Sequence, residues 1–181
     1  VLSIGCIFLP RTGLKHTALL TQDADGSFPY AKKLAEMCKY YGFDGWFVNQ
    51  ETDTAVESFD AAAAGEEPSG SAEGGLTKQH AVLMQEFILQ FQEKAGDKLD
   101  IMWYDSMTSE GKMDWQNALT DENTYYMTDK NGNPVSDSMF LNFWWTTDKL
   151  APKELLKASR AKAEEINISP YELYAGIDVQ A

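Results

Sequence analysis

The chain has 181 residues, of which 44% are hydrophobic and 24% charged, so it holds enough apolar material for a globular core. Its formal net charge is −13, and such an acidic surface would repel nucleic acid or an anionic membrane. No apolar run reaches the roughly 18 residues that are needed to span a bilayer. An uncharged ligand suits this chain better than either of those partners.

The apolar opening segment 1–10 lacks a basic region and a starting methionine, so it predicts a core strand rather than a signal peptide. The missing methionine suggests that the chain was cut from something longer. Its location is left open between extracellular, cell-surface and cytoplasmic. Cys6 and Cys38 are expected to be buried thiols, with one disulfide as the alternative.

The first part of the chain predicts a strand, a helix and a second strand. Residues 1–9 form the first strand, closed by Pro10. Ser27 is expected to cap a helix that ends at Gly42 in a left-handed conformation. Segment 43–49 then predicts the second strand. The apolar stripe of the helix follows a helical period: Leu34, Met37, Cys38 and Tyr41.

The middle of the chain begins with a composition shift. Residues 56–76 are rich in Ala, Gly, Glu and Ser and predict a long exposed loop that is partly disordered. Thr77 is expected to cap a helix that runs to Ala95 and ends at Gly96. A third strand is predicted at 99–106. The helix carries a second apolar stripe: Met84, Phe87, Ile88 and Phe91.

The last part is rich in turns over 107–138, where the segment KNGNP at 130–134 is the clearest turn. A short helix or a hairpin is expected around 113–119. The remaining elements are a strand, a helix and a strand: 138–145, Pro152 to about Glu165, and 171–180.

Strands that alternate with helices predict βα units, right-handed crossovers and a parallel sheet. An open doubly wound sheet and a (β/α)₈ barrel are the two candidates. No G-x-G-x-x-G or P-loop follows a strand, which disfavours a nucleotide-binding open sheet. A whole barrel needs about 200 to 250 residues. With five expected strands, residues 1–181 therefore predict a contiguous part of one (β/α)₈ barrel domain of the α/β class.

Polar and aromatic residues gather at the carboxyl ends of the predicted strands, where a barrel keeps its active site. Rings can pack on the C–H face of a sugar, and amides and carboxylates can bind its hydroxyls. Each tryptophan can equally be a core residue. Two adjacent tryptophans on a strand would face opposite sides. The candidate rings are Trp103, Tyr104, Trp115, Trp144 and Trp145, and the polar residues are Asn49, Glu51, Asp105, Asn142 and Asp178.

Asn49 and Glu51 are two residues apart and therefore share one face of an extended chain with Phe47. Glu51 is a candidate general acid, which needs apolar walls that Trp46, Phe47 and Val48 could help to form. Alternatively, Glu51 is a solvated loop carboxylate or opens a short helix, and Asn49 caps the strand end or the next turn. Asp44 lies early in its strand and is expected to be structural.

Three segments together resemble glycoside hydrolase family 85, the endo-β-N-acetylglucosaminidases, which cut between the two N-acetylglucosamines of the N-glycan core. The segments are YYGFDGWFVNQETD at 40–53, IMWYDSMTSEGKMDWQNAL at 101–119 and MFLNFWW at 139–145. The resemblance implies a (β/α)₈ barrel. It also matches the family's N-x-E motif to Asn49, Gln50 and Glu51.

The same resemblance implies a substrate-assisted reaction, in which the 2-acetamido carbonyl oxygen of the sugar attacks the anomeric carbon and gives an oxazolinium intermediate. Glu51 would protonate the leaving oxygen and then activate water, or another sugar's hydroxyl in transglycosylation. Asn49 would hold the acetamide N–H, and Tyr104 would bind the acetamide or the intermediate. The residues lining the sugar subsites would be Trp115, Phe143 and Trp144. The partners would be N-linked glycans, and we expect no cofactor and no metal.

Two alternatives stay open. An ordinary retaining glycosidase would use Glu51 and Asp105, with their carboxyl groups about 5 to 5.5 Å apart. A non-catalytic domain would bind N-glycans through the same rings and amides. Because strands are expected to be missing from the barrel, an exposed sheet edge would favour association.

Overall fold

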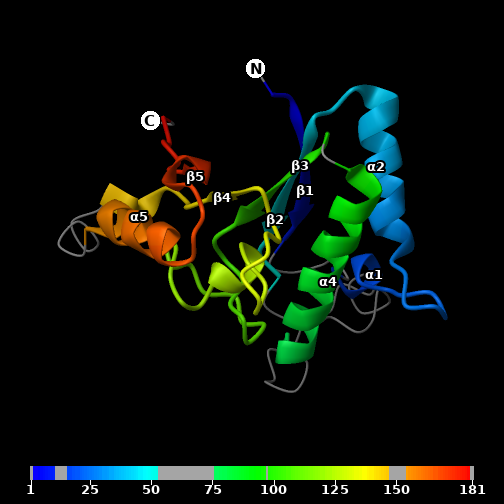
Figure 1. The fold of residues 1–181 in the computed structure, drawn as a ribbon, viewed down its shortest axis with the longest axis horizontal. Coiled ribbons are helices and arrows are strands. Elements are labelled where there is room, and N and C mark those ends of the chain that lie inside the picture. The colour runs from blue at the N-terminus through cyan, green and yellow to red at the C-terminus, as the bar shows by residue number, and fades with distance from the viewer. Residues whose placement is uncertain (1, 11–15, 53–75, 97, 147–153, 180–181) are drawn as a thin grey trace, which may run out of the picture.

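The computed structural model describes residues 2–10, 16–52, 76–96, 98–146 and 154–179 (Figure 1). The described strands form one parallel sheet in which each strand pairs with the next along the chain. A doubly wound sheet reverses its strand order, whereas barrel strands keep the order of the chain. The observed order confirms the α/β prediction and is that of a (β/α)₈ barrel. The strands are β1 Ile4–Leu9, β2 Gly45–Gln50, β3 Asp100–Tyr104, β4 Ser138–Phe140 and β5 Leu173–Tyr174.

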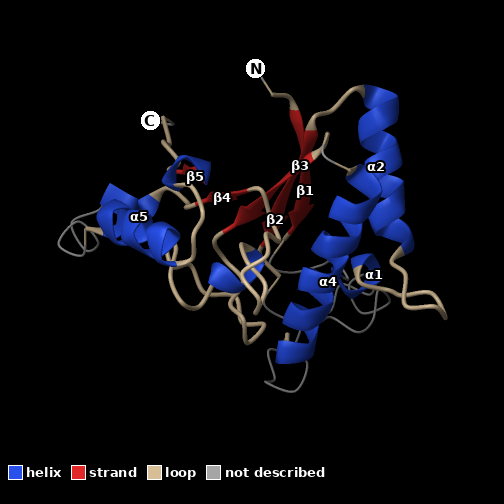
Figure 2. Cartoon of the chain, viewed as in Figure 1, coloured by secondary structure: helices blue, strands red, loops and turns tan. Residues whose placement is uncertain are grey.

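Helices α2 and α4 lie side by side against one face of the sheet, and α5 lies beside β4 and β5 (Figures 1 and 2). A short helix, α1, is present where the sequence predicted only a polar loop. The helices are α1 His16–Leu19, α2 Pro29–Tyr41, α4 Lys78–Ala95 and α5 Leu155–Glu165, and the described 3₁₀ helices are η1 Thr124–Tyr126, η2 Trp144–Thr146 and η4 Pro170–Glu172.

The two long helices have clear end signals. At the start of α4, Thr77 and His80 form a capping box, and Gly96 ends the helix as predicted. Helix α2 ends at Gly42, which has a φ of 76°, also as predicted. Its N-cap, however, is Phe28 and not Ser27. The Ser27 hydroxyl donates a hydrogen bond to Asp25 Oδ1 over 2.7 Å instead.

The last two strands are shorter than predicted. Strand β4 ends at Phe140 because Asn142 adopts a left-handed conformation, with a φ of 70°, and turns the chain out of the sheet. Trp144 and Trp145 therefore lie in a 3₁₀ helix rather than a strand. In β5 the residues from Pro170 form a 3₁₀ turn before a strand of two residues.

The other predicted segments have mixed outcomes. Around 113–119 the chain forms no helix. Met113 makes an antiparallel bridge to Met107, and the Asp114 N–H donates to the Ser106 carbonyl over 2.7 Å, so a short hairpin closes at the start of this segment. The turn at 130–134 is confirmed, with Asp129 accepting N–H bonds from Asn131 and Asn133 over 2.8 Å each. Helix α5 ends at Glu165 as predicted. The expected helix start at Pro152 and most of the loop at 56–76 lie outside the described residues.

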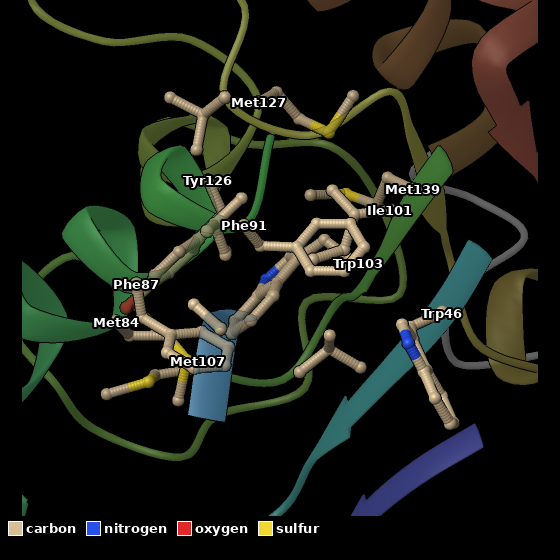
Figure 3. Close-up of a cluster of buried hydrophobic side chains, with 14 of the residues drawn as sticks. Trp46, Met84, Phe87, Phe91, Ile101, Trp103, Met107, Tyr126, Met127 and Met139 are labelled. Atoms are coloured by element: carbon tan, nitrogen blue, oxygen red, sulfur yellow. The ribbon is translucent and has the colours of Figure 1, made fainter. Parts of the chain in front are cut away.

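The hydrophobic core lies between the sheet and helices α2 and α4 (Figure 3). All four residues of the predicted α4 stripe are fully buried, which confirms the stripe. Trp103 is also fully buried and stacks on Tyr126 with a ring-centroid distance of 4.2 Å. In the α2 stripe Cys38 is buried, but Tyr41 is exposed and stacks on Phe43.

The prediction of two buried thiols is wrong for Cys6. Both cysteines are free, and Cys6 is exposed while Cys38 is buried. Cys6 pairs with Phe47 on the sheet face that α2 and α4 do not cover, so no helix shields it.

In the part of the chain that the structure describes, no helix is long and apolar enough to cross a membrane.

Candidate active site

Aromatic rings line the sheet face opposite the helices. Phe47 contacts Tyr104 and Phe140, with ring centroids 5.9 and 5.6 Å apart. Phe140 in turn contacts Phe143 at 5.3 Å. These rings come from β2, β3, β4 and the segment after β4, so one continuous aromatic surface crosses the sheet towards the carboxyl ends of its strands. We call Phe47, Tyr104, Phe140 and Phe143 the ring face.

Asn49 points to the ring face, as the alternation of side chains along β2 predicts. Its Oδ1 is buried, and it has no hydrogen-bond donor among the residues that the structure describes. A buried acceptor without a donor is costly, since it has lost its water and gained nothing in return. Asn49 therefore presents an acceptor that a ligand N–H can satisfy.

Glu51 follows the end of β2 and stays in register with β1, because its backbone N–H donates to the Leu9 carbonyl over 2.8 Å. The residue between the pair, Gln50, is fully buried on the helix side, and its Nε2 donates to the Thr52 carbonyl. The Ser106 hydroxyl donates to the Gln50 carbonyl and so ties the end of β3 to this segment. Asn49 and Glu51 thus share one side of a fixed stretch of backbone.

The prediction that Trp46, Phe47 and Val48 form apolar walls around Glu51 is wrong for two of the three residues, because side chains alternate along β2. Val48 is fully buried on the helix side, and the Trp46 indole N–H donates to the Leu34 carbonyl of α2 over 3.0 Å. Phe47 alone of the three predicted wall residues shares the face of Glu51.

Tyr104 lies close to Glu51 and to Trp115. The pairing of Phe47 with Met102 places Tyr104 beside Asn49 on the ring face. Burial raises the pKa of the Tyr104 hydroxyl, the negative charge of Glu51 raises it further, and the nearby Trp115 side chain acts in the opposite direction. Tyr104 is thus a neutral hydroxyl at physiological pH, close enough to Glu51 to sense its charge.

Asp105 points away from this face. Its side chain is fully buried, and its carboxylate accepts the backbone N–H groups of Gln116 and Asn117 over 3.0 and 2.7 Å. It also accepts from Asn123 Nδ2 over 3.0 Å. Burial raises its pKa to about 7, although these three donors lower it. A buried carboxylate engaged in this way does not serve as a nucleophile opposite Glu51, which argues against the ordinary retaining alternative.

The predicted sugar-binding rings fall into two groups. Trp115 is partly buried, whereas Phe143 and Trp144 are 42% and 58% exposed, so both can meet a ligand. Trp103 belongs to the core, and Trp145 donates its indole N–H to the Gly176 carbonyl over 2.7 Å. The adjacent tryptophans do lie in different surroundings, as predicted, but for a different reason, since they occupy a 3₁₀ helix.

The two remaining acidic residues lie apart. Asp44 accepts the backbone N–H of Ser3 over 2.6 Å at the amino end of the sheet, so its expected structural role is confirmed. Asp178 is exposed. A surface hollow lined by Ile4, Met102 and Asp137 also lies at the amino ends of the strands, away from Glu51. Among the described residues, no group of three His, Cys, Asp or Glu side chains could hold a metal ion.

The sequence interpretation named Asn142 as a polar candidate but missed Asn117 and the contact that joins the two side chains. Asn142 Nδ2 donates to Asn117 Oδ1 over 3.0 Å, and both residues have a positive φ. Asparagine tolerates this conformation better than other non-glycine residues. The asparagines at positions 117 and 142 were therefore a weak sequence signal for turns at these points. Nothing local to the sequence indicates that these two side chains meet.

Comparison with known proteins gives a consistent result. A model of glycosyl hydrolase family 85 matches residues 1–181. Cytosolic endo-beta-N-acetylglucosaminidase of Danio rerio is 28% identical over 185 residues, covering 100% of this chain and 21% of that protein. Cytosolic endo-beta-N-acetylglucosaminidase 2 of Arabidopsis thaliana is 26% identical over 83% of this chain and 16% of its own length. The chain thus spans about a fifth of the length of the curated relatives that it matches.

Two solved structures resemble the fold. The Endo-D glycoside hydrolase domain of Streptococcus pneumoniae superposes with a TM-score of 0.75 and 31% identity, over 97% of this chain and 25% of that chain. The chitinase domain of the spore coat protein CotE of Clostridium difficile has a TM-score of 0.57 and 15% identity, over 97% of this chain and 48% of its own, which concerns the fold alone. With the family model matching from end to end, the chain belongs to glycosyl hydrolase family 85.

Proposed function

We propose that this chain forms part of the catalytic barrel of an endo-β-N-acetylglucosaminidase, which cleaves the β-1,4 bond between the two N-acetylglucosamines of an N-glycan core. Two observations support the substrate class. The relatives named above carry this activity in their names, and the ring face offers the apolar surface that a sugar ring packs against.

The buried, unsatisfied Oδ1 of Asn49 carries the mechanistic proposal. In a substrate-assisted reaction the 2-acetamido carbonyl oxygen forms a bond to the anomeric carbon while the bond to the leaving oxygen breaks. The acetamide N–H becomes more acidic as positive charge develops on the group. Asn49 Oδ1 accepts that N–H, so the substrate supplies the donor that the described protein residues do not.

The neighbours of Asn49 complete the proposed reaction. Glu51 donates its proton to the leaving oxygen and then removes a proton from water, which attacks the anomeric carbon while the bond from that carbon to the acetamide oxygen breaks and the 2-acetamido group is restored. A sugar hydroxyl in place of water gives transglycosylation. Tyr104, held as a neutral hydroxyl, hydrogen-bonds the acetamide oxygen or the intermediate. Trp115, Phe143 and Trp144 line the flanking sugar subsites.

The first test is mass spectrometry of an N-glycopeptide before and after incubation with the full-length protein that contains this chain. We expect a peptide that retains one N-acetylglucosamine. A substrate in which the 2-acetamido group is replaced by a hydroxyl should remain uncut, because it lacks the internal nucleophile. Cleavage of that analogue would contradict the substrate-assisted mechanism.

The non-catalytic alternative is tested with the same protein. Glu51→Gln should retain binding of the glycopeptide and lose hydrolysis by about 10³-fold, because it removes a general acid and base without changing the shape of the side chain. If the unmodified, folded protein binds the glycopeptide but does not cleave it, the chain belongs to a glycan-binding domain instead.

A further inference from the structure

Tyr104 and Asp105 are adjacent at the end of β3 and point to opposite sides of the sheet. Tyr104 lies on the ring face and senses the charge of Glu51. Asp105 is fully buried on the other side. A change in the backbone position of Asp105 therefore moves Tyr104 as well, because one strand end carries both.

The carboxylate of Asp105 holds the backbone directly after Trp115. Oδ1 accepts the N–H of Gln116, and Oδ2 accepts the N–H of Asn117. Both are hydrogen bonds to a carboxylate, which are stronger than those between neutral groups. Asn123 Nδ2 completes the set by donating to Oδ1 and to the backbone carbonyls of Asp105 and Ala118. The strand end and the Trp115 segment are thus joined as one unit.

The same unit reaches the segment after β4. Asn117 Oδ1 accepts from Asn142 Nδ2, and Asn142 is 3% exposed and immediately precedes Phe143. The carbonyl of Asn142 accepts the N–H of Gly176 over 2.9 Å, which ties the segment to the chain after β5. Rings that the sequence places 28 residues apart, Trp115 and Phe143, therefore share one buried polar network that begins at Asp105.

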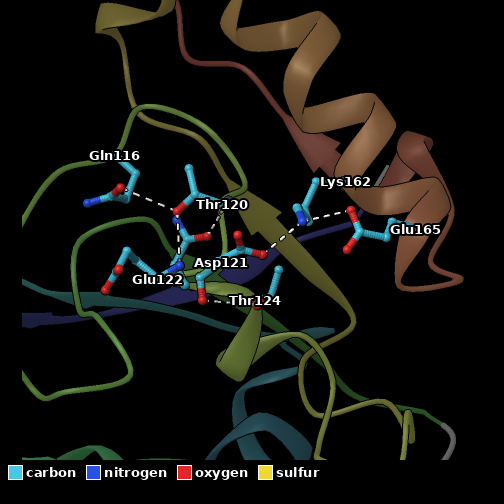
Figure 4. Close-up of polar contacts among 8 residues, drawn as sticks. Gln116, Thr120, Asp121, Glu122, Thr124, Lys162 and Glu165 are labelled. Atoms are coloured by element: carbon cyan, nitrogen blue, oxygen red, sulfur yellow. Dashed lines mark hydrogen bonds and ion pairs between the residues drawn. The ribbon is translucent and has the colours of Figure 1, made fainter.

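The loop that follows β3 also contacts helix α5, through residues further along the loop (Figure 4). Lys162 of α5 pairs with Asp121 over 2.8 Å and with Glu165 over 2.7 Å. The backbone N–H of Leu119 donates to Ser159 Oγ over 3.0 Å. Asp121 is 88% exposed in its side chain, so its ion pair contributes little to the position of the loop. Asp121 is therefore a suitable control residue, because it is an exposed aspartate in the same loop as Gln116 and Asn117.

We propose that Asp105 is a positioning residue of the active site, whose carboxylate holds the backbone N–H groups of Gln116 and Asn117 and so fixes the position of Trp115 relative to Tyr104. Asp105 does not touch substrate; it acts mainly through Trp115. The kinetic consequence rests on the proposed function, whereas the structural consequence is independent of it.

The structural consequence is tested by ¹⁹F NMR of the full-length protein labelled with 5-fluorotryptophan, with the Trp115 resonance assigned from Trp115→Phe. Asp105→Asn keeps the side-chain shape but turns an N–H donor towards the donors of the loop. We expect the Trp115 resonance to shift or broaden, while the resonance of the core residue Trp103 stays in place. The control Asp121→Asn should leave the Trp115 resonance unchanged.

The kinetic consequence is tested by a double-mutant cycle. Asp105→Asn should lower kcat/KM by about 10-fold to 100-fold, as a displaced positioning group does. In the Trp115→Ala background the same substitution should cost several-fold less, because the ring that it positions is absent and only its effect through Tyr104 and Phe143 remains. The control Asp121→Asn should cost less than about 2-fold in either background.

Two results would overturn the proposal. One is an unchanged Trp115 resonance in folded Asp105→Asn, and the other is an equal loss of kcat/KM with and without Trp115. If Asp105→Asn does not fold, the unmodified protein decides. In a pH titration, the Trp115 resonance should then shift with the same midpoint as the amide protons of Gln116 and Asn117. A Trp115 resonance that does not follow this titration refutes the coupling of Asp105 to Trp115. If the protein has no glycosidase activity, the NMR result still stands by itself.

Discussion

Asn49 and Glu51 have different surroundings although only Gln50 separates them. Asn49 Oδ1 is buried without a donor, and Glu51 lies at the strand end beyond the last paired residue of β2. The first is suited to accept one fixed N–H, and the second to exchange protons with a leaving group and with water. The roles proposed for the two residues follow from these surroundings rather than from their residue types alone.

Asn49→Ala removes the acceptor and leaves the rest of β2 unchanged. We expect kcat/KM on an N-glycopeptide to fall by about 100-fold, since one preorganised contact to the developing charge is lost. Steady-state kinetics by chromatography of the released glycan measure this. Asn142→Ala is not a suitable control because it belongs to the buried network; Asp121→Asn is. If Asn49→Ala cleaves at the normal rate, the substrate-assisted role of Asn49 is wrong.

Asp105 has a consequence for stability. Burial and the nearby charge of Asp114 raise its pKa to about 7 in the folded protein, against about 3.9 when unfolded. Between about pH 4 and about pH 7, Asp105 therefore keeps its proton in the folded protein but has lost it in the unfolded chain. This contribution to the unfolding free energy is fully present below about pH 4 and is lost as pH rises through about 7.

Urea unfolding of the wild type and Asp105→Asn measures this contribution. The difference in unfolding free energy between wild type and variant should be larger at about pH 5 than at about pH 8, with the wild type losing stability as pH rises. Parallel pH profiles for the two proteins would show that Asp105 does not titrate in this range.

At the scale of the element, α4 packs on both α2 and β3 through a fully buried apolar stripe. Its buried residues contact β3 and α2, while Gln79 lies on an exposed side of the helix. The Trp103 and Tyr126 stack sits between the helix, the strand and the 3₁₀ helix η1 (Figure 3). Tyr104 is the last residue of β3, and Asp105 follows it. The packing of β3 against α4 therefore fixes the position of these two residues at the carboxyl end of the sheet.

Phe91→Ala should lower the unfolding free energy by about 3 to 5 kcal/mol, because Phe91 is fully buried and its loss leaves a cavity. Gln79→Ala, on the exposed side of the same helix, should change it by less than about 0.5 kcal/mol. Urea unfolding followed by tryptophan fluorescence compares the two. A similar small effect for both would mean that α4 does not pack on the sheet as described.

At the scale of the whole molecule, β1 and β5 are the edges of the described sheet. The ring-face side of these strands exposes Phe8 at 53% and Tyr174 at 45%. Unpaired backbone groups beside exposed rings form a surface on which another chain can add.

When the 181-residue chain is produced by itself, we therefore expect reversible association that increases with concentration. Sedimentation velocity over a dilution series measures it. The full-length protein that contains the chain is the control, and it should show a smaller concentration dependence. A chain that stays monomeric throughout the series would contradict the prediction.

The fold was largely predictable because its signals are local. Thr77 and Gly96 mark the ends of α4, and the stripe between them has a helical period. The strand ends were less predictable. Asn142 leaves the sheet in a left-handed conformation, and nothing before it distinguishes β4 from a longer strand. Pattern alone also failed for Cys6, because burial depends on which sheet face the helices cover.

The sequence by itself determined that Asn49 and Glu51 share a face, since side chains alternate along any strand, and it identified the family through three separated segments. Only the tertiary structure decided which partners those faces meet. Asp105 was expected as a nucleophile in one alternative, yet its carboxylate binds backbone groups 11 and 12 residues further along the chain. Trp103 and Trp115 are equally aromatic in sequence, but one lies in the core and the other beside Tyr104. Alternation is a property of the backbone, whereas these contacts depend on how distant segments return to the sheet.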